Sequence, residues 1–188
     1  RDALADQRIG SVLIGPGLGR GDEARAKLDT ALASGKPLVL DADALHLLDP
    51  SQVARSSPII VTPHDGELEA LCRRFTVIGE GRLAKAKALA GSSGLVVLAK
   101  GPDSFVVTSD GAVAVGPPAS SGLSVAGSGD ALAGSLAARL AAGSTPFEAA
   151  CVALWLHAEA ARLCRPAFTA DDLALSVNAA LARAVGGK

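Results

Sequence analysis

The stretch SVAGSGDALAGSLAARLAAG, residues 124–143, joins a loop of small residues to a long Ala/Leu helix pattern. Gly127 and Gly129 have no side chains, so neighbouring backbone N–H groups can approach one anion there. The helix that follows adds the positive end of its dipole. We therefore expect Gly127, Ser128 and Gly129 to bind a phosphate, with Asp130 taking the proton of a hydroxyl held beside it. The alternative is that Asp130 only caps the helix.

Before this stretch, apolar runs of strand length alternate with helical patterns. The predicted strands lie within residues 8–15, 36–43, 57–64, 95–101, 104–109 and 112–117, the last two joined by the hairpin signal Asp110-Gly111. The predicted helices cover about 22–35, 65–75, 81–94, 128–142, a segment opened by a capping box at Thr145 and Glu148, and 168–187. Hydrophobic strands that alternate with helices predict an α/β fold, with a mostly parallel sheet and helices on both faces.

In such sheets, ligands bind at the carboxyl ends of the strands. GPGLGRG (15–21) follows the first predicted strand, but Arg20 stands where a G-x-G-x-x-G fingerprint needs its last glycine. We interpret it as a glycine-rich turn whose backbone approaches a ligand, although a simple turn would have the same composition.

Three further strand ends carry polar residues. LDADAL (40–45) has two acids that could bind Mg²⁺ or a ribose, or could cap the next helix, and the sequence leaves this open. TPHDGE (62–67) places His64 at a strand-to-helix junction, where we expect ligand contact, although a lone His is usually uninformative. Lys100 follows the fourth strand and can face a phosphate or lie in solvent; the sequence contains no Walker A motif.

Length and composition narrow the function classes. The 188 residues suggest one domain, and a net charge of −1 without a basic block argues against nucleic acid or an anionic membrane as partner. No apolar run approaches the ~20 residues that span a bilayer. We expect Cys72, Cys151 and Cys164 to be buried and unpaired, in a reducing cytoplasm. The chain has no Met and begins at Arg1, so we expect a piece of a longer polypeptide.

The motifs form a recognisable set from about residue 9 to 175. AGSGDALAG resembles the G-x-G-D signature of ribokinase-like enzymes, and GPGLG, LDADAL, TPHDGE and AKG accompany it in the matching order. Together they resemble the ADP/ATP-dependent NAD(P)H-hydrate dehydratases. The resemblance implies a ribokinase-like α/β fold and a repair reaction, in which a nucleotide phosphorylates the ring hydroxyl of hydrated NADH or NADPH and elimination of phosphate restores the cofactor.

The same resemblance implies roles for individual residues. Gly15, Gly17, Gly19 and His64 match positions that contact the hydrated cofactor. The segment Lys100, Gly101, Pro102, Asp103 and Ser104, with Gly129, matches the part that contacts ADP or ATP, and Mg²⁺ is expected with the nucleotide. Asp130 matches the acid that lies close to the hydrate and acts as the base. No protein metal site is expected.

The chain also departs from the family pattern. Family domains begin further upstream, so residues 1–188 are expected to be a single ribokinase-like domain that lacks its N-terminal βα units, weak or inactive alone. PPASSGLSVAG (117–127) replaces the usual Gly-Asn-Pro-Gly, and no epimerase domain is visible. An exposed sheet edge would favour a homo-oligomer.

Two other functions fit the same residues. A ribokinase-like kinase of a small vitamin-precursor alcohol would also use Asp130 and the glycines, and a non-catalytic module would only bind the nucleotide. GPGLG together with TPHDGE favours the dehydratase. The sequence does not distinguish ADP from ATP as the preferred nucleotide.

Overall fold

The core of the molecule is one twisted sheet. A computed structural model describes residues 2–53, 58–118 and 120–186, and over these residues six strands lie in the order β1-β2-β3-β4-β5-β6. Their bounds are β1 Val12–Ile14, β2 Leu38–Leu40, β3 Ile59–Val61, β4 Val96–Ala99, β5 Phe105–Val107 and β6 Val113–Val115. The strands are shorter than the predicted runs, because the polar ends of those runs turn into loops.

The first four strands run parallel, and β5 pairs in antiparallel fashion with both β4 and β6. Leu38 of β2 pairs with Val12 of β1 and with Ile59 of β3, whereas Ala99 of β4 pairs with Phe105 of β5 in antiparallel register. The β5–β6 hairpin turns at Asp110-Gly111, as the sequence predicted. Since β1 to β4 point the same way, their carboxyl ends meet at one edge of the sheet.

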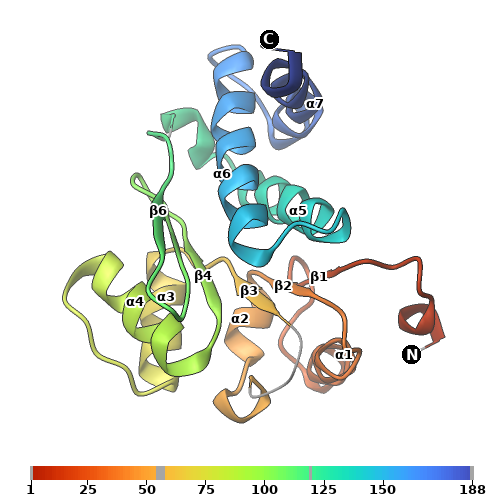
Figure 1. Cartoon of the computed structure of the whole chain (residues 1–188), viewed down its shortest axis with the longest axis vertical. Helices are drawn as coiled ribbons and strands as arrows, with labels where there is room; N and C mark the ends of the chain where they lie inside the picture. Colours follow the sequence, from red (N-terminus) through yellow and green to blue (C-terminus); the bar gives the residue numbers. More distant parts are fainter. Residues whose placement is uncertain (1, 54–57, 119, 187–188) are drawn as a thin grey trace.

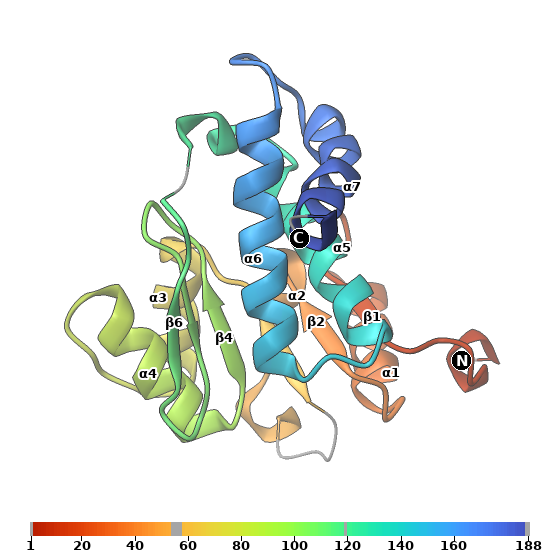
Figure 2. The same ribbon diagram turned by 45° about the horizontal axis from the view of Figure 1, so that its top comes forward.

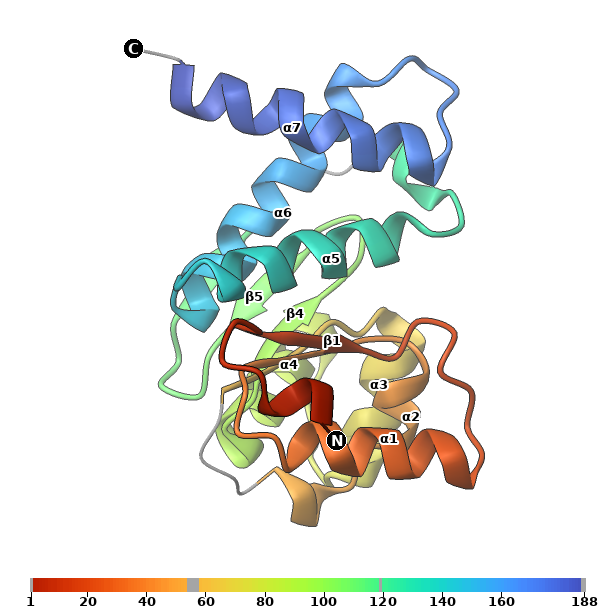
Figure 3. The same ribbon diagram turned by 90° about the vertical axis from the view of Figure 1, so that its right-hand side faces the viewer.

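Helices cover both faces of the sheet, which confirms the predicted layers (Figure 1). One face carries the helices that connect the parallel strands, namely α1 Asp22–Leu32, α2 Asp43–Leu47, α3 Asp65–Arg74 and α4 Gly81–Ser93. Figure 3 shows α1 and α2 below β1, with α5 above it. The strands place residues in both interior clusters, since Leu38 and Leu40 belong to the core on the α1–α4 side and Val39 to the core against α5 and α6.

The opposite face is covered by the C-terminal helices. These are α5 Ser128–Ala141, α6 Pro146–Leu163 and α7 Ala170–Gly186. In Figure 2, α6 crosses in front of the sheet between α5 and the β5–β6 hairpin. Leu136 and Ala153 are fully buried where α5 and α6 meet the strands. Short 3₁₀ segments, Asp2–Ala5, Pro50–Gln52 and Ser121–Ser124, complete the described chain.

Local sequence signals predicted several helix ends correctly. The capping box at α6 is present, with the Thr145 hydroxyl accepting from the Glu148 N–H and the Glu148 carboxylate accepting from the Thr145 N–H. Gly94 ends α4 in the left-handed conformation. The helix predicted over about 22–35, which would end at Gly35, is too long, because α1 ends at Leu32 with Ala33 as its C-cap.

The cysteines are only partly as predicted. All three are free thiols; Cys72 is buried, but Cys151 and Cys164 are half-buried. The latter two lie on α6 and just beyond it, where the helix surface is not fully covered by its neighbours. Within the part of the chain that the structure describes, no helix has the length and hydropathy needed to cross a membrane.

Candidate functional site

Four loops meet at the carboxyl edge of the parallel strands. β1 is followed by Gly15, β2 by Asp41, β3 by Pro63 and His64, and β4 by Lys100. The N–H of Lys100 donates to the carbonyl of Pro63 (2.8 Å), which ties two of these loops together. The parallel arrangement therefore brings polar side chains from distant parts of the sequence to one place.

The centre of this edge is an ion pair. The Lys100 Nζ lies 2.7 Å from the Asp41 Oδ1, and the Asp41 side chain is only 2% exposed, against 20% for Lys100. A charge-assisted hydrogen bond at this depth orients the ammonium group. Lys100 is therefore held in the site, and the solvated alternative is wrong. Neither acid of LDADAL acts as the cap of α2, since its N-cap residue is Ala42.

The N-terminus of α5 faces this ion pair. A Cβ added to Gly129 would lie 3.3 Å from the Lys100 Nζ and 3.9 Å from the Asp41 Oδ2. Gly127 is the N-cap residue of α5 with φ +87°, a conformation that favours glycine. The bare backbone of Gly129 thus lies beside a fixed positive charge, an arrangement suited to an anion.

The backbone N–H groups that are free to bind an anion are not all those that the sequence predicted. The N–H of Ser128 donates to the carbonyl of Val125 (3.2 Å) and is already used. Among the described residues, none accepts a hydrogen bond from the N–H of Gly129 or of Asp130. The donors available to an anion are therefore the Gly129 and Asp130 N–H groups, together with the Lys100 ammonium.

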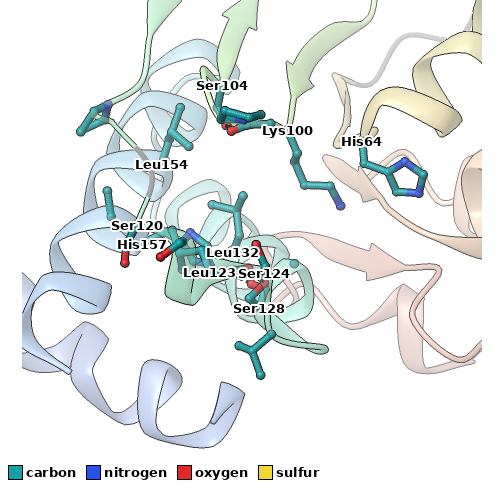
Figure 4. Close-up of a pocket in the computed structure, with 17 residues that line it drawn as sticks. His64, Lys100, Ser104, Ser120, Leu123, Ser124, Ser128, Leu132, Leu154 and His157 are labelled. Carbon is teal, nitrogen blue, oxygen red and sulfur yellow. Dashed lines mark hydrogen bonds between the residues drawn. The ribbon is translucent and has the colours of Figure 1, made fainter. Parts of the chain in front are cut away.

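A cavity of about 760 Å³ opens beside these groups (Figure 4). In the close-up, Lys100 and Ser104 lie on one side, and Ser120, Ser124, Ser128 and His157 lie across from them, while the His64 ring lies at the edge of the group and points away from it. Its volume is in the range of pockets that hold small ligands. Its lining residues are His64, Lys100, Gly101, Pro102, Ser104, Pro117, Ser120, Ser121, Leu123, Ser124, Val125, Ser128, Gly129, Leu132, Leu154, His157 and Ala158.

The loop after β4 is held in a tight turn at the cavity wall. The Ser104 hydroxyl donates to the carbonyl of Gly101 (3.0 Å) and lies 3.2 Å from its N–H. Arg82 of α4 donates to the carbonyl of Asp103 (2.8 Å) and pairs with Asp65. Asp103 is exposed and is absent from the cavity lining, unlike its neighbours in the predicted nucleotide segment. No sequence signal pointed to these contacts of Arg82, because they join residues far apart in the chain.

His64 caps a helix and also lines the cavity. Its Nδ1 accepts from the N–H of Gly66 (3.0 Å) and of Glu67 (3.4 Å), and the Glu67 carboxylate accepts from the His64 N–H (2.9 Å). Because Nδ1 accepts, the neutral ring carries its proton on Nε2. The His64 Nε2 lies 3.4 Å from the Glu67 Oε1, a long contact, and the side chain is 61% exposed, so Nε2 can still donate to a ligand. Capping by His was not foreseen from the sequence.

The glycine-rich loop is tied to the β2 loop. The Asp43 carboxylate accepts from the Gly19 N–H (3.0 Å) and from the Arg20 guanidinium (2.8 Å). The hydrogen bond from Arg20, followed by that from Gly19, lowers the pKa of Asp43. Gly15 and Gly17 have φ of +136° and +65°, and a Cβ on Gly15 would lie 1.7 Å from the backbone carbonyl oxygen of Asp41. Gly15 is thus required for close contact between the two loops.

Asp130 occupies the first turn of α5, where the sequence placed it. Its side chain is exposed, and neither Asp130 nor Gly127 lines the cavity. The neighbouring Gly129 does line it. Asp130 therefore adjoins the cavity lining through Gly129, and its own N–H is one of the two free N–H groups.

His157 is a site residue that the sequence analysis missed. It lies on α6, is 6% exposed, and its Nε2 is 2.9 Å from the carbonyl oxygen of Ser128. Burial lowers the pKa of His157, and the hydrogen bond to Ser128 opposes this in part. The Ser128 carbonyl and the Gly129 N–H belong to one peptide unit, so His157 also orients that N–H. A lone His within an Ala/Leu helix was the only sequence signal for it.

Comparison with known proteins gives a consistent result. A family model described as NAD(P)H-hydrate dehydratase matches residues 2–183. The chain is 36% identical over 169 residues to an ADP-dependent (S)-NAD(P)H-hydrate dehydratase of Neisseria meningitidis serogroup B, covering 85% of this chain and 57% of that protein. It is 40% identical over 159 residues to the bifunctional NAD(P)H-hydrate repair enzyme Nnr of Mycobacterium leprae, covering 83% of this chain and only 33% of that protein.

Solved structures agree on the fold. The ADP/ATP-dependent NAD(P)H-hydrate dehydratase of Bacillus subtilis, co-crystallised with ATP/Mg²⁺ and soaked with CoA, superposes with a TM-score of 0.80 at 27% identity, covering 93% of this chain and 66% of that one. Arabidopsis thaliana ribokinase superposes with a TM-score of 0.57 at 18% identity, covering 94% and 58%. The ribokinase-like fold is thereby confirmed.

Proposed function

This chain belongs to the NAD(P)H-hydrate dehydratase family, and on that premise we propose that it carries out nucleotide-dependent dehydration of hydrated NADH and NADPH. The observation that carries the proposal is the approach of Gly129 to the Lys100–Asp41 pair at the rim of the 760 Å³ cavity. It supplies a fixed positive charge and free N–H groups at one point, as phosphoryl transfer requires.

The cavity suits an adenine nucleotide as the phosphoryl donor. We propose that Gly101, Pro102, Ser104, Ser128 and Gly129 line the nucleotide side. The lining combines apolar side chains with several hydroxyl groups, which is the usual composition of a cofactor pocket. When bound, the nucleotide supplies the phosphoryl group that makes the ring hydroxyl of the hydrate a leaving group.

The donor set also fits Mg²⁺ carried by the nucleotide. Over residues 2–53, 58–118 and 120–186, no group of three or more His, Cys, Asp and Glu side chains could hold a metal ion. Mg²⁺ is commonly bound through substrate phosphates and water, with few protein ligands. The ion would supply charge neutralisation at the phosphates, beside Lys100.

The remaining predicted residues have separate roles in this proposal. Asp130, which adjoins the cavity lining through Gly129, accepts the proton of the hydrate hydroxyl, and the Gly129 and Asp130 N–H groups bind the developing negative charge. His64 offers its Nε2–H to the hydrate. Gly15, Gly17 and Gly19 form the loop against which the hydrated cofactor lies.

The experiment is a direct assay of the full-length protein. Hydrated NADH or NADPH is incubated with Mg²⁺ and either ADP or ATP, and restored reduced cofactor is followed by its absorbance. Appearance of that absorbance supports the proposal. A phosphorylated alcohol that accumulates from a panel of vitamin-precursor alcohols would support the kinase instead, and nucleotide binding without turnover of any substrate would indicate a binding module.

Asp130→Asn tests the assigned base. We expect kcat to fall by about 10²–10⁴-fold, the usual effect of losing a general base, while the Kd for ADP stays close to that of the wild type. Asp171→Asn is the matched control, because Asp171 is an exposed acid in the first turn of α7 and does not line the cavity. Unchanged turnover in Asp130→Asn would exclude Asp130 as the base.

We also propose a homo-oligomer and a cytoplasmic location for this single ribokinase-like domain. In the described sheet β1 is an edge strand, and an unpaired edge favours association with another strand. Sedimentation of the full-length protein measures the oligomeric state, and a monomer at assay concentration would contradict the first of these proposals.

A further inference from the structure

Asp41 is the most deeply buried charged side chain of the site, yet the proposed reaction assigns it no role. Its carboxylate is 2% exposed and its Oδ1 accepts a hydrogen bond of 2.7 Å from Lys100. Its Oδ2 faces the N-terminus of α5, 3.9 Å from where a Cβ of Gly129 would lie. The Lys100 Nζ lies 3.3 Å from the same point, so the ammonium group is the nearer of the two to the N-terminus of α5 and the carboxylate holds it from behind.

The backbone holds Asp41 in this place from both sides. Its N–H donates to the carbonyl of Ile14 and its own carbonyl accepts from the N–H of Ala44, each at 3.2 Å. The next residue, Ala42, has φ +48° and ψ −122°, a strained conformation for a residue with a side chain. Such strain persists only where the surrounding structure imposes it, and it is common at functional sites.

A carboxylate is an unfavourable neighbour for a phosphate. Asp41 therefore gives no direct attraction for the nucleotide, and its charge opposes nucleotide binding. What it does provide is a fixed position for the Lys100 ammonium, because a Lys side chain is otherwise flexible and strongly hydrated. Catalysis gains from a charge that is already in place when negative charge develops.

We propose that Asp41 is a positioning residue that holds the Lys100 ammonium at the N-terminus of α5, where the phosphoryl group is transferred. This inference rests on the proposed function. It predicts that Asp41 raises turnover without strengthening nucleotide binding, and that this effect on turnover depends entirely on Lys100.

The first test is Asp41→Asn in the full-length protein, which keeps the side-chain size and removes the charge. We expect kcat to fall tenfold or more, whereas the KM for the nucleotide and the Kd for ADP, measured by calorimetry, stay unchanged or decrease. Glu159→Gln is the matched control, because Glu159 is 13% exposed and pairs with Arg162 and Arg183 outside the cavity. That variant should keep the wild-type kcat and Kd.

The second test is the double variant with Lys100→Met. If Asp41 acts through Lys100, Asp41→Asn adds no further loss of kcat in the Lys100→Met background. A loss of the same size in both backgrounds would overturn the inference. Should Asp41→Asn not fold, Asp41→Ser, which leaves room for water beside Lys100, enters the same comparison.

Three other results for Asp41→Asn would overturn the inference, and two of them would give Asp41 a different role. A tenfold higher Mg²⁺ requirement in Asp41→Asn would make Asp41 a metal ligand, and weaker ADP binding with unchanged kcat would make it part of the nucleotide pocket. Wild-type turnover in Asp41→Asn would leave it without a role in the reaction. An inactive wild-type protein would instead refute the proposed function, so the two failures are distinguishable.

Discussion

Replacing Gly129 by Ala should separate the stability of this protein from its function. Gly129 is in the first turn of α5, and its φ is outside the positive range, so Ala fits the backbone. A Gly→Ala change at a compatible helical position stabilises a protein by about 0.4–1 kcal/mol. For a chain of this size, that corresponds to a rise in Tm of about 1–4 °C.

The same methyl group should weaken nucleotide binding. It would lie 3.3 Å from the Lys100 Nζ, tighter than most contacts of a real Cβ, so the ammonium would have to shift by a few tenths of an ångström. It would also occupy space that a phosphate oxygen needs against the Gly129 N–H. Loss of one hydrogen bond to a charged group costs about 1.5–3 kcal/mol, which corresponds to a roughly 10- to 150-fold higher Kd.

The effects on stability and on nucleotide binding are separated by two measurements on two variants. Tm is measured by differential scanning fluorimetry and the Kd for ADP by calorimetry, for Gly129→Ala and for Gly134→Ala. Gly134 is an exposed glycine of the same helix, with no neighbouring atom within 4 Å of an added Cβ. We expect both variants to gain stability and only Gly129→Ala to lose affinity. Unaltered ADP binding in Gly129→Ala would refute the placement of the phosphates at this turn.

Three further predictions concern stability. Gly15→Ala should lower the free energy of unfolding, measured in urea, by about 3 kcal/mol or more, because its Cβ would lie 1.7 Å from the Asp41 carbonyl oxygen. Gly17→Ala, with no atom within 4 Å of the added Cβ, should lower it by only about 1–2 kcal/mol. Equal losses in the two variants would contradict the contact between the two loops. Thr145→Ala should lower the free energy of unfolding by about 1 kcal/mol through loss of the α6 cap, and a change below about 0.3 kcal/mol would argue against that cap. Burial lowers the pKa of His157 below its ordinary 6.5, so the unfolded state binds more protons and stability should fall as pH drops below 6.5. Denaturant unfolding of the wild type and His157→Gln across that range should give a shallower pH dependence in the variant, and parallel curves would contradict this.

Local patterns were sufficient for the elements and for much of the site. Adjacent residues determine hydrophobic period, helix caps and turns, so the Thr145 capping box, the Asp110-Gly111 hairpin and the α5 N-terminus were predicted correctly. The rule that parallel strands present their carboxyl ends at one edge then located His64 and Lys100 at the cavity.

Interactions through space could not be predicted in this way. Lys100 pairs with Asp41 across 59 residues, and His157 reaches Ser128 across 29. From the sequence, Lys100 could face a phosphate or lie in solvent, and the acids of LDADAL could bind Mg²⁺ or a ribose, or cap a helix. The pairing of Lys100 with Asp41 was not among these alternatives, because the two residues follow β4 and β2, which are not neighbours in the sheet.

The sequence by itself thus determined the order of strands and helices, the layered α/β class and the edge of the sheet where the polar loops meet, since each depends on residues close together in the chain. Only the tertiary structure decided which charges meet, which N–H groups of α5 remain free and which side chains close the cavity. Those outcomes depend on distances between separate loops, and these are set by the packing of the sheet and its helices.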